Sequence, residues 1–131
     1  CALPILRTVV VDGGGVEREI LPPVSGQAVT PWAMNASGVV VGRAGAYAST
    51  AYAGGESPRT CINTAQGTSR AIISSQGVTT DLATWVTSKG LKLPTGAVLV
   101  DAYDINDQGS ILAVMRASNG TLSQVRLTAK P

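Results

Sequence analysis

The chain has 131 residues, enough for one domain with a modest core. Ten basic and eight acidic residues give a net charge of +2 without any Lys or Arg run, so a nucleic-acid partner is not expected. The chain contains no His, which excludes Ser-His and Cys-His catalytic pairs and His metal ligands within it and disfavours catalysis. We therefore predict a non-enzymatic protein without a cofactor.

The first third of the chain predicts two antiparallel hairpins. Residues 4–12 (PILRTVVVD) are rich in β-branched side chains, and residues 16–21 (VEREIL) alternate as in a half-exposed strand. Three glycines at 13–15 predict the turn between them. Residues 27–34 then lead through a turn (NASG) into the apolar run 39–41, which predicts a strand covered on both faces.

A long connection at residues 44–69 has neither helical nor strand periodicity. It is rich in Ala, Gly, Ser and Thr, and connections of this length are usually functional or flexible. Tyr47 and Tyr52 within it are therefore the best candidates for contacting a partner.

The two cysteines, Cys1 and Cys61, favour an exported bacterial protein. Paired in a disulfide, they would close a loop of about 60 residues, nominally worth roughly 4 kcal/mol. A cysteine at position 1 also fits a lipoprotein tethered to a membrane through that residue, or a fragment that begins there. All three interpretations are compatible with a secreted, extracellular or cell-surface location, and only the lipidated form predicts a membrane partner.

Residues 70–80 predict another hairpin, with its turn at 75–77. A short helix near 81–89 follows, because Asp81 can cap its N-terminus and Gly90 suits its C-terminal end. Its apolar face consists of residues at positions i, i+3 and i+4, namely Leu82, Trp85 and Val86.

Three further strands are predicted at residues 97–103, 111–117 and 122–128. A polar turn at 104–109 joins the first two, and Asn119-Gly120 is a strong hairpin signal between the last two. Short turns throughout indicate mainly antiparallel sheets, so the predicted fold class is all-β with one short helix.

A hairpin motif occurs twice, since Asn106 and Gly109 stand 71 residues after Asn35 and Gly38. This predicts a single β domain over residues 1–131, with one repeat at about 4–43, an insertion at 44–69 and a second repeat at about 70–131. Asn and Gly are the constant positions of the motif, and these are the residues that a tight turn requires.

The second repeat resembles the HAF-type extracellular repeat of bacterial secreted proteins, whose usual form is an RAFLW strand, a turn, a G…DL strand and then A.gINd.GqivG. The matching segments are Arg70-Ala71-Ile72-Ile73, Gln76-Gly77, Thr80-Asp81-Leu82 and Asp104-Ile105-Asn106-Asp107-Gln108-Gly109. The first repeat is degenerate, with Ala33 and Ala36 in place of Asp104 and Asp107.

The resemblance implies secretion and a β-propeller-like repeat architecture, and it carries no catalytic residues. Two repeats are too few for a closed propeller, which typically has about 4–8 blades. A partial propeller within a longer protein, a ring of subunits and a sandwich of two sheets remain as alternatives.

The segment 104–109 also resembles the start of a calcium loop, but Met115 stands where the EF-hand has its bidentate Glu. We prefer a plain turn and no metal; the alternative is a calcium site formed by Asp101, Asp104, Asn106 and Asp107. Acid–base catalysis by a carboxylate pair would need a β-bulge, because residues 101 and 104 face opposite sides of a regular strand. No catalytic residue is predicted.

Trp32 and Trp85 occupy different places in the two repeats, which favours packing roles for both over a lectin-like platform. The features together predict a secreted or cell-surface, non-catalytic protein that acts through binding or self-assembly, as a filament or surface-layer subunit or an adhesion module. Its partners would be further copies of itself or a surface glycan or protein, and the exposed edge of 122–128 could pair with a neighbour. The alternative is a carbohydrate-binding module or an accessory domain of a secreted hydrolase.

Overall fold

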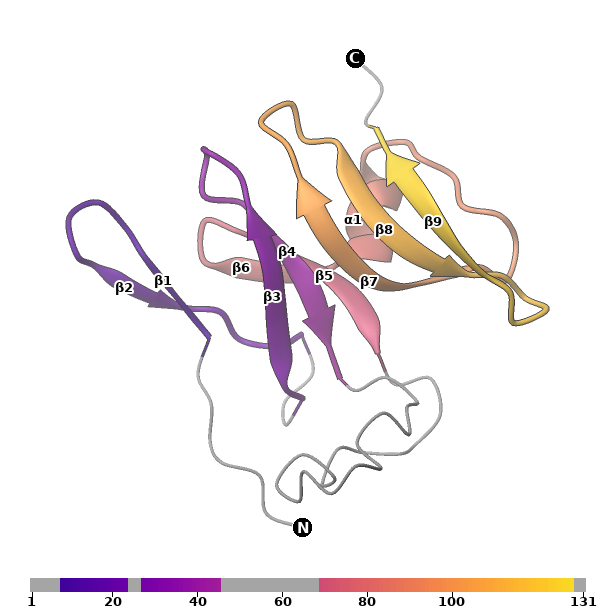
Figure 1. Ribbon diagram of the computed structural model, residues 1–131, viewed down its shortest axis with the longest axis horizontal. Coiled ribbons are helices and arrows are strands. Elements are labelled where there is room, and N and C mark those ends of the chain that lie inside the picture. The colour runs from indigo at the N-terminus through magenta and orange to yellow at the C-terminus, as the bar shows by residue number, and fades with distance from the viewer. Residues whose placement is uncertain (1–7, 24–26, 46–68, 129–131) are drawn as a thin grey trace, which may run out of the picture.

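The computed structural model describes residues 8–23, 27–45 and 69–128, and it is built mainly of β-strands (Figure 1). Within these residues the strands form three antiparallel sheets, which confirms the predicted all-β class. In chain order the elements are β1 (Val9–Val11), β2 (Glu17–Glu19), β3 (Val29–Met34), β4 (Val40–Ala44), β5 (Arg70–Ser75), β6 (Val78–Asp81), α1 (Leu82–Ser88), β7 (Val98–Ile105), β8 (Ile111–Arg116) and β9 (Leu122–Leu127).

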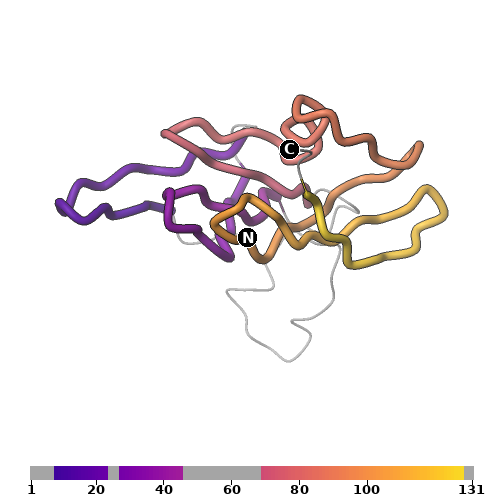
Figure 2. The backbone as a smooth tube through the Cα atoms, turned by 90° about the horizontal axis from the view of Figure 1, so that it is seen from above, coloured from indigo at the N-terminus to yellow at the C-terminus, as the bar shows by residue number. Residues whose placement is uncertain are grey.

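The largest sheet has the strand order β3-β4-β5-β6, so it joins a hairpin of the first repeat to a hairpin of the second. The three-stranded sheet β7-β8-β9 packs on it through β7, which contacts β3, β4 and β5. The hairpin β1-β2 forms a small separate sheet. Figures 1 and 2 show that this hairpin and the β8–β9 turn lie at opposite ends of the molecule.

The main core lies between the two larger sheets and under α1. Its buried side chains are Val41, Ala71 and Ile73 from the four-stranded sheet, Leu82 and Val86 from α1, and Leu99, Ala102, Ile105, Ile111, Ala113 and Leu127 from the three-stranded sheet. Val40 and Val41 are both buried on consecutive positions of β4, which confirms that this strand is covered on both faces.

The helix begins and ends as predicted. The Asp81 carboxylate accepts a hydrogen bond from the backbone N–H of Ala83, and Gly90 adopts a left-handed φ of 83° just beyond the C-cap Lys89. Leu82 and Val86 are buried while Trp85 is half-buried against the core, so the predicted apolar face is confirmed. No helix in the described part of the chain is both long and apolar enough to cross a membrane.

Four hairpins close with the same pattern of turn hydrogen bonds. In the turn after β3, the N–H of Asn35 donates to the carbonyl of Val39, and the N–H of Gly38 donates to the carbonyl of Asn35. The same two bonds recur in the turns that contain Gly15, Gly109 and Gly120. Each of these glycines has φ between 79° and 89°, a region that favours Gly. The glycines that predict the turns in the sequence therefore stand where the turn backbone requires them.

The two repeats also share an irregularity in their backbones. The register of β3 against β4 shifts between Pro31 and Ala33, and that of β7 against β8 shifts between Ala102 and Asp104. The extra residue is therefore Trp32 in one repeat and Tyr103 in the other, again 71 positions apart. The duplication thus includes a β-bulge as well as a turn.

The first predicted hairpin is observed, with a second strand shorter than expected and a first strand whose predicted beginning lies outside the described residues. The strands predicted at 4–12 and 16–21 are observed as β1 and β2, which have 3 residues each, and residues 1–7 lie outside the described part of the chain. At the turn, Asp12 accepts bonds from the N–H groups of Gly14 and Val16, and Val16 therefore belongs to the turn and not to β2.

Candidate functional site

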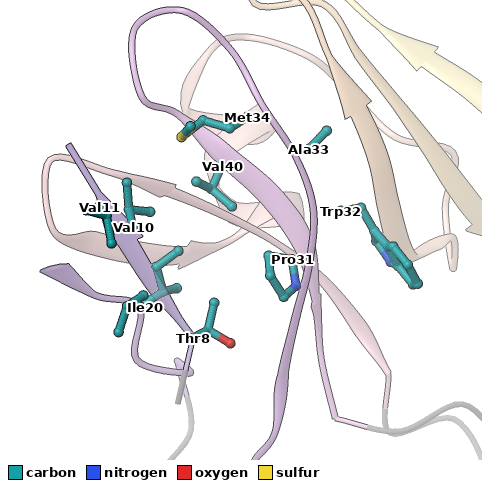
Figure 3. A pocket seen from close by; sticks show the side chains of 10 residues that line it. Thr8, Val10, Val11, Ile20, Pro31, Trp32, Ala33, Met34 and Val40 are labelled. Atoms are coloured by element: carbon teal, nitrogen blue, oxygen red, sulfur yellow. The ribbon is translucent and has the colours of Figure 1, made fainter. Parts of the chain in front are cut away.

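An apolar groove of about 330 Å³ separates the β1–β2 hairpin from the β3–β4 hairpin (Figure 3). Its floor is formed by Val40 and Ile20, both of which are 5% exposed. Around this floor lie the remaining lining residues, namely Thr8, Val9, Val10, Val11, Pro31, Trp32, Ala33 and Met34. The groove is therefore lined almost entirely by apolar residues, from strands of both hairpins.

Large apolar side chains at the rim of the groove face solvent. Val11 is 57% exposed and Met34 is 54% exposed, although the floor beside them is buried. Grouped apolar side chains of this kind on a protein surface usually mark a site of interaction. The groove is thus the strongest candidate for a binding site among the described residues.

The internal repeat shows what the corresponding surface does in the second copy. Counting 71 positions forward, Pro31, Met34 and Val40 correspond to Ala102, Ile105 and Ile111. These three equivalents have relative exposures of 0%, 7% and 0% and belong to the main core, where the four-stranded sheet covers them. The same face is therefore covered throughout in the second repeat, whereas in the first repeat Pro31 and Met34 are exposed and Val40 alone is buried.

Trp32 borders the groove on β3, but its side chain lies on the other side of this strand. Figure 3 shows it pointing away from Pro31 and Met34. Its indole Nε1 donates to both carboxylate oxygens of Asp101, at 3.0 Å each. The guanidinium of Arg43 lies 5.4 Å from the centre of the Trp32 ring, and its Nη1 is 3.3 Å from Asp101 Oδ2. This cluster joins β3 and β4 to β7.

The turns of the two repeats touch each other at the same end of the sheets. Asn35 Nδ2 donates to the backbone carbonyl of Asn106 over 3.2 Å, and the N–H of Ala36 donates to Asp107 Oδ1 over 2.8 Å. Asn106 Oδ1 in turn accepts bonds from Gln108 and Ser110 of its own turn. The polar motif at 104–109 is therefore occupied by contacts that fix the turns.

The residues considered for calcium make separate contacts. Asp101 is 5% exposed and binds Trp32 and Arg43, whereas Asp104 is exposed and accepts from the N–H of Ile105. A bulge does occur between residues 101 and 104, but these contacts direct the two carboxylates to different neighbours. Within the described ranges, no group of three or more His, Cys, Asp or Glu residues could hold a metal ion.

The other predicted site residues, Cys1, Cys61, Tyr47 and Tyr52, lie outside the described residues. The disulfide and the contacts of the loop tyrosines therefore stay predictions. The groove and the contact of Trp32 with Asp101 were missed from the sequence. The signal available was the 71-residue offset itself, which aligns Trp32 with Tyr103 and Met34 with Ile105.

No protein-family model, curated protein or solved structure matches this chain.

Proposed function

We propose that this chain is a non-catalytic β-repeat module of the HAF type, exported by a bacterium, that acts by binding or assembling through the apolar groove between β1–β2 and β3–β4. The observation that carries the proposal is the exposure of Val11 and Met34 beside the buried floor residues Val40 and Ile20. Export is supported by the low charge content, the two cysteines and the resemblance of residues 70–131 to extracellular repeats.

The edge of β1 that does not pair with β2 makes an extended segment one suitable ligand for the groove. Among the described residues β1 pairs with β2 alone, so the backbone N–H and C=O groups of its other edge lie outside a β-ladder. Such an edge can take up an additional strand, whose backbone supplies hydrogen bonds while alternate side chains enter the apolar groove. The absence of His and the engagement of Asp101 in packing support a binding role over catalysis.

A selection from a displayed random peptide library, with the intact chain as bait, tests this function. We expect enrichment of peptides with alternating apolar residues, and we expect Met34→Glu to abolish their binding by placing a charge at the groove rim. Thr84→Glu, on the exposed side of α1, is the control with the same added charge and should bind as the wild type. Failure to enrich any peptide, or binding that is unaffected by Met34→Glu, would refute the groove as a binding site.

A carbohydrate-binding module is a second candidate because Trp32 is 50% exposed and is held in place by Asp101 and Arg43. A fixed, half-exposed aromatic ring offers an apolar face on which a sugar ring can stack. A glycan array separates the two functions: signals that disappear in Trp32→Ala but persist in Met34→Glu would favour the sugar site. An empty array would leave the groove as the remaining candidate.

A further inference from the structure

We infer that the groove receives the outer face of the β8–β9 hairpin of a second copy of this chain, in a head-to-tail contact. This inference rests on the proposed binding function of the groove and names its partner, which packs a sheet face on the groove side chains and does not add a strand to β1. The outer face is defined as the side of β8 and β9 that points away from the core and consists of Leu112, Val114, Arg116, Leu122, Gln124 and Arg126.

The groove is one half of an interface that already exists inside the chain. In the second repeat, Ile105 and Ile111 pack with Val41 and Ile73 of the four-stranded sheet in one continuous core. Their equivalents in the first repeat, Met34 and Val40, line the groove instead. The groove side chains thus lie on a surface of the first repeat, and the equivalent surface of the second repeat is covered by the four-stranded sheet.

The outer face of β8 is the other half of the same interface. Leu112 and Val114 stand 71 positions after Val41 and Arg43, the two residues of β4 that face the three-stranded sheet. Leu112 and Val114 are only half-buried, and Leu122 on the neighbouring strand is 61% exposed. The groove and this outer face therefore correspond to the two sides of the contact made between the repeats.

The positions of the two surfaces allow each chain to contact two neighbouring copies. The groove hairpin β1–β2 and the β8–β9 hairpin lie at opposite ends of the long axis (Figures 1 and 2), so one chain uses its two surfaces on two different neighbours. A contact between unlike surfaces produces a ring when its rotation closes and a filament when it does not. Blocking either surface alone should therefore stop assembly.

Sedimentation velocity of the full chain over a range of concentrations tests this inference. The wild type should form species larger than dimers. Met34→Glu in the groove and Leu122→Glu on the outer face should each lower the association constant about tenfold or more, since a charge would be buried in the contact. Position 122 pairs with Arg116 across the sheet, so the introduced carboxylate has a favourable neighbour in the folded chain. Thr84→Glu should assemble as the wild type, and thermal melting verifies that all variants fold.

Mixing the two variants gives the sharpest result. Met34→Glu retains an intact outer face and Leu122→Glu retains an intact groove, so an equimolar mixture should form a complex of two chains that grows no further. A wild type that stays monomeric at all concentrations, or a mixture that stays monomeric although both variants fold, would refute head-to-tail assembly. If Leu122→Glu assembles normally, the groove does not bind the outer face and the inference also fails. Peptides captured by a monomeric wild type would show that the groove still binds, so this failure is distinct from failure of the proposed function.

Discussion

Asn35 donates a hydrogen bond from its side-chain Nδ2 to the backbone carbonyl of Asn106, its own counterpart in the second repeat 71 residues later. The Oδ1 atoms of both residues serve their local turns, where each accepts two backbone N–H groups. Asn35 therefore has two tasks, one within its turn and one between turns. A carboxylate could perform the first but not the second, because it has no donor.

Asn35→Asp should accordingly destabilise the chain by about 1 kcal/mol, the usual loss for one hydrogen bond with its partner left in place. The turn should survive because Asp also accepts from backbone N–H groups. The measurement is urea denaturation. Asn106→Asp is the matched control, since the contact uses the backbone carbonyl of that residue, and equal losses in the two variants would contradict this assignment.

Asp101→Asn should be considerably more damaging, by roughly 2–4 kcal/mol, because it leaves the cation of Arg43 beside a neutral group in a largely buried site. The substitution also replaces one acceptor of the Trp32 indole with a donor-bearing amide. Asp104→Asn is the control: this exposed carboxylate should change the free energy of unfolding by less than about 0.5 kcal/mol. Similar denaturation midpoints for the two variants would show that the cluster contributes little.

Gln76→Asn should stabilise the chain by about 0.5–1 kcal/mol, because Asn tolerates a positive φ better than Gln does and Asn-Gly is the preferred pair in such turns. Gln76 and Gly77 form the two-residue turn between β5 and β6, and their φ angles are 52° and 80°. Thermal melting shows directly whether the substitution raises or lowers stability. At the next position, Gly77→Ala should lower stability by about 1–2 kcal/mol, because Ala disfavours a positive φ. A higher melting temperature for this variant would contradict the turn geometry.

Gly42→Ala should prevent normal pairing of β3 with β4. A Cβ at position 42 would overlap the backbone carbonyl oxygen of Thr30 and come within 2.8 Å of Pro31 Cα, and neither backbone atom can move aside cheaply. We expect a loss of more than about 3 kcal/mol or failure to fold, seen by circular dichroism and denaturation. The equivalent residue of the second repeat is Ala113, so Ala113→Gly is the matched control and should cost only about 1 kcal/mol.

The features that sequence reasoning predicted correctly are those encoded locally. Asn35, Gly38, Asn106 and Gly109 determine their turns through backbone conformations and short-range hydrogen bonds, and Asp81 caps the helix in the same way. The groove depends instead on which elements cover a given sheet face, and that is a property of the assembled fold. Met34 and Ile105 are both apolar and occupy equivalent strand ends, yet one is exposed and the other buried.

The contact of Trp32 with Asp101 could not be predicted from the sequence for a related reason. Its two residues are separated by 69 positions and meet only because β7 packs on β3 and β4. The bulges at Trp32 and Tyr103 also alter the alternation of side chains along their strands, so a regular strand pattern misassigns the faces beyond them.

The pairing of β4 with β5 is expected to form late in folding. Most strand pairs in the described part of the chain join neighbours through short turns and can form by local collisions, whereas Ala44 must find Arg70 across the whole connection between them. This pairing therefore carries the largest loop-closure entropy of any in the four-stranded sheet, and it is the expected slow step. Because that entropy grows only logarithmically, doubling the connection would cost about 0.6 kcal/mol, a small change for a segment that joins the two repeats.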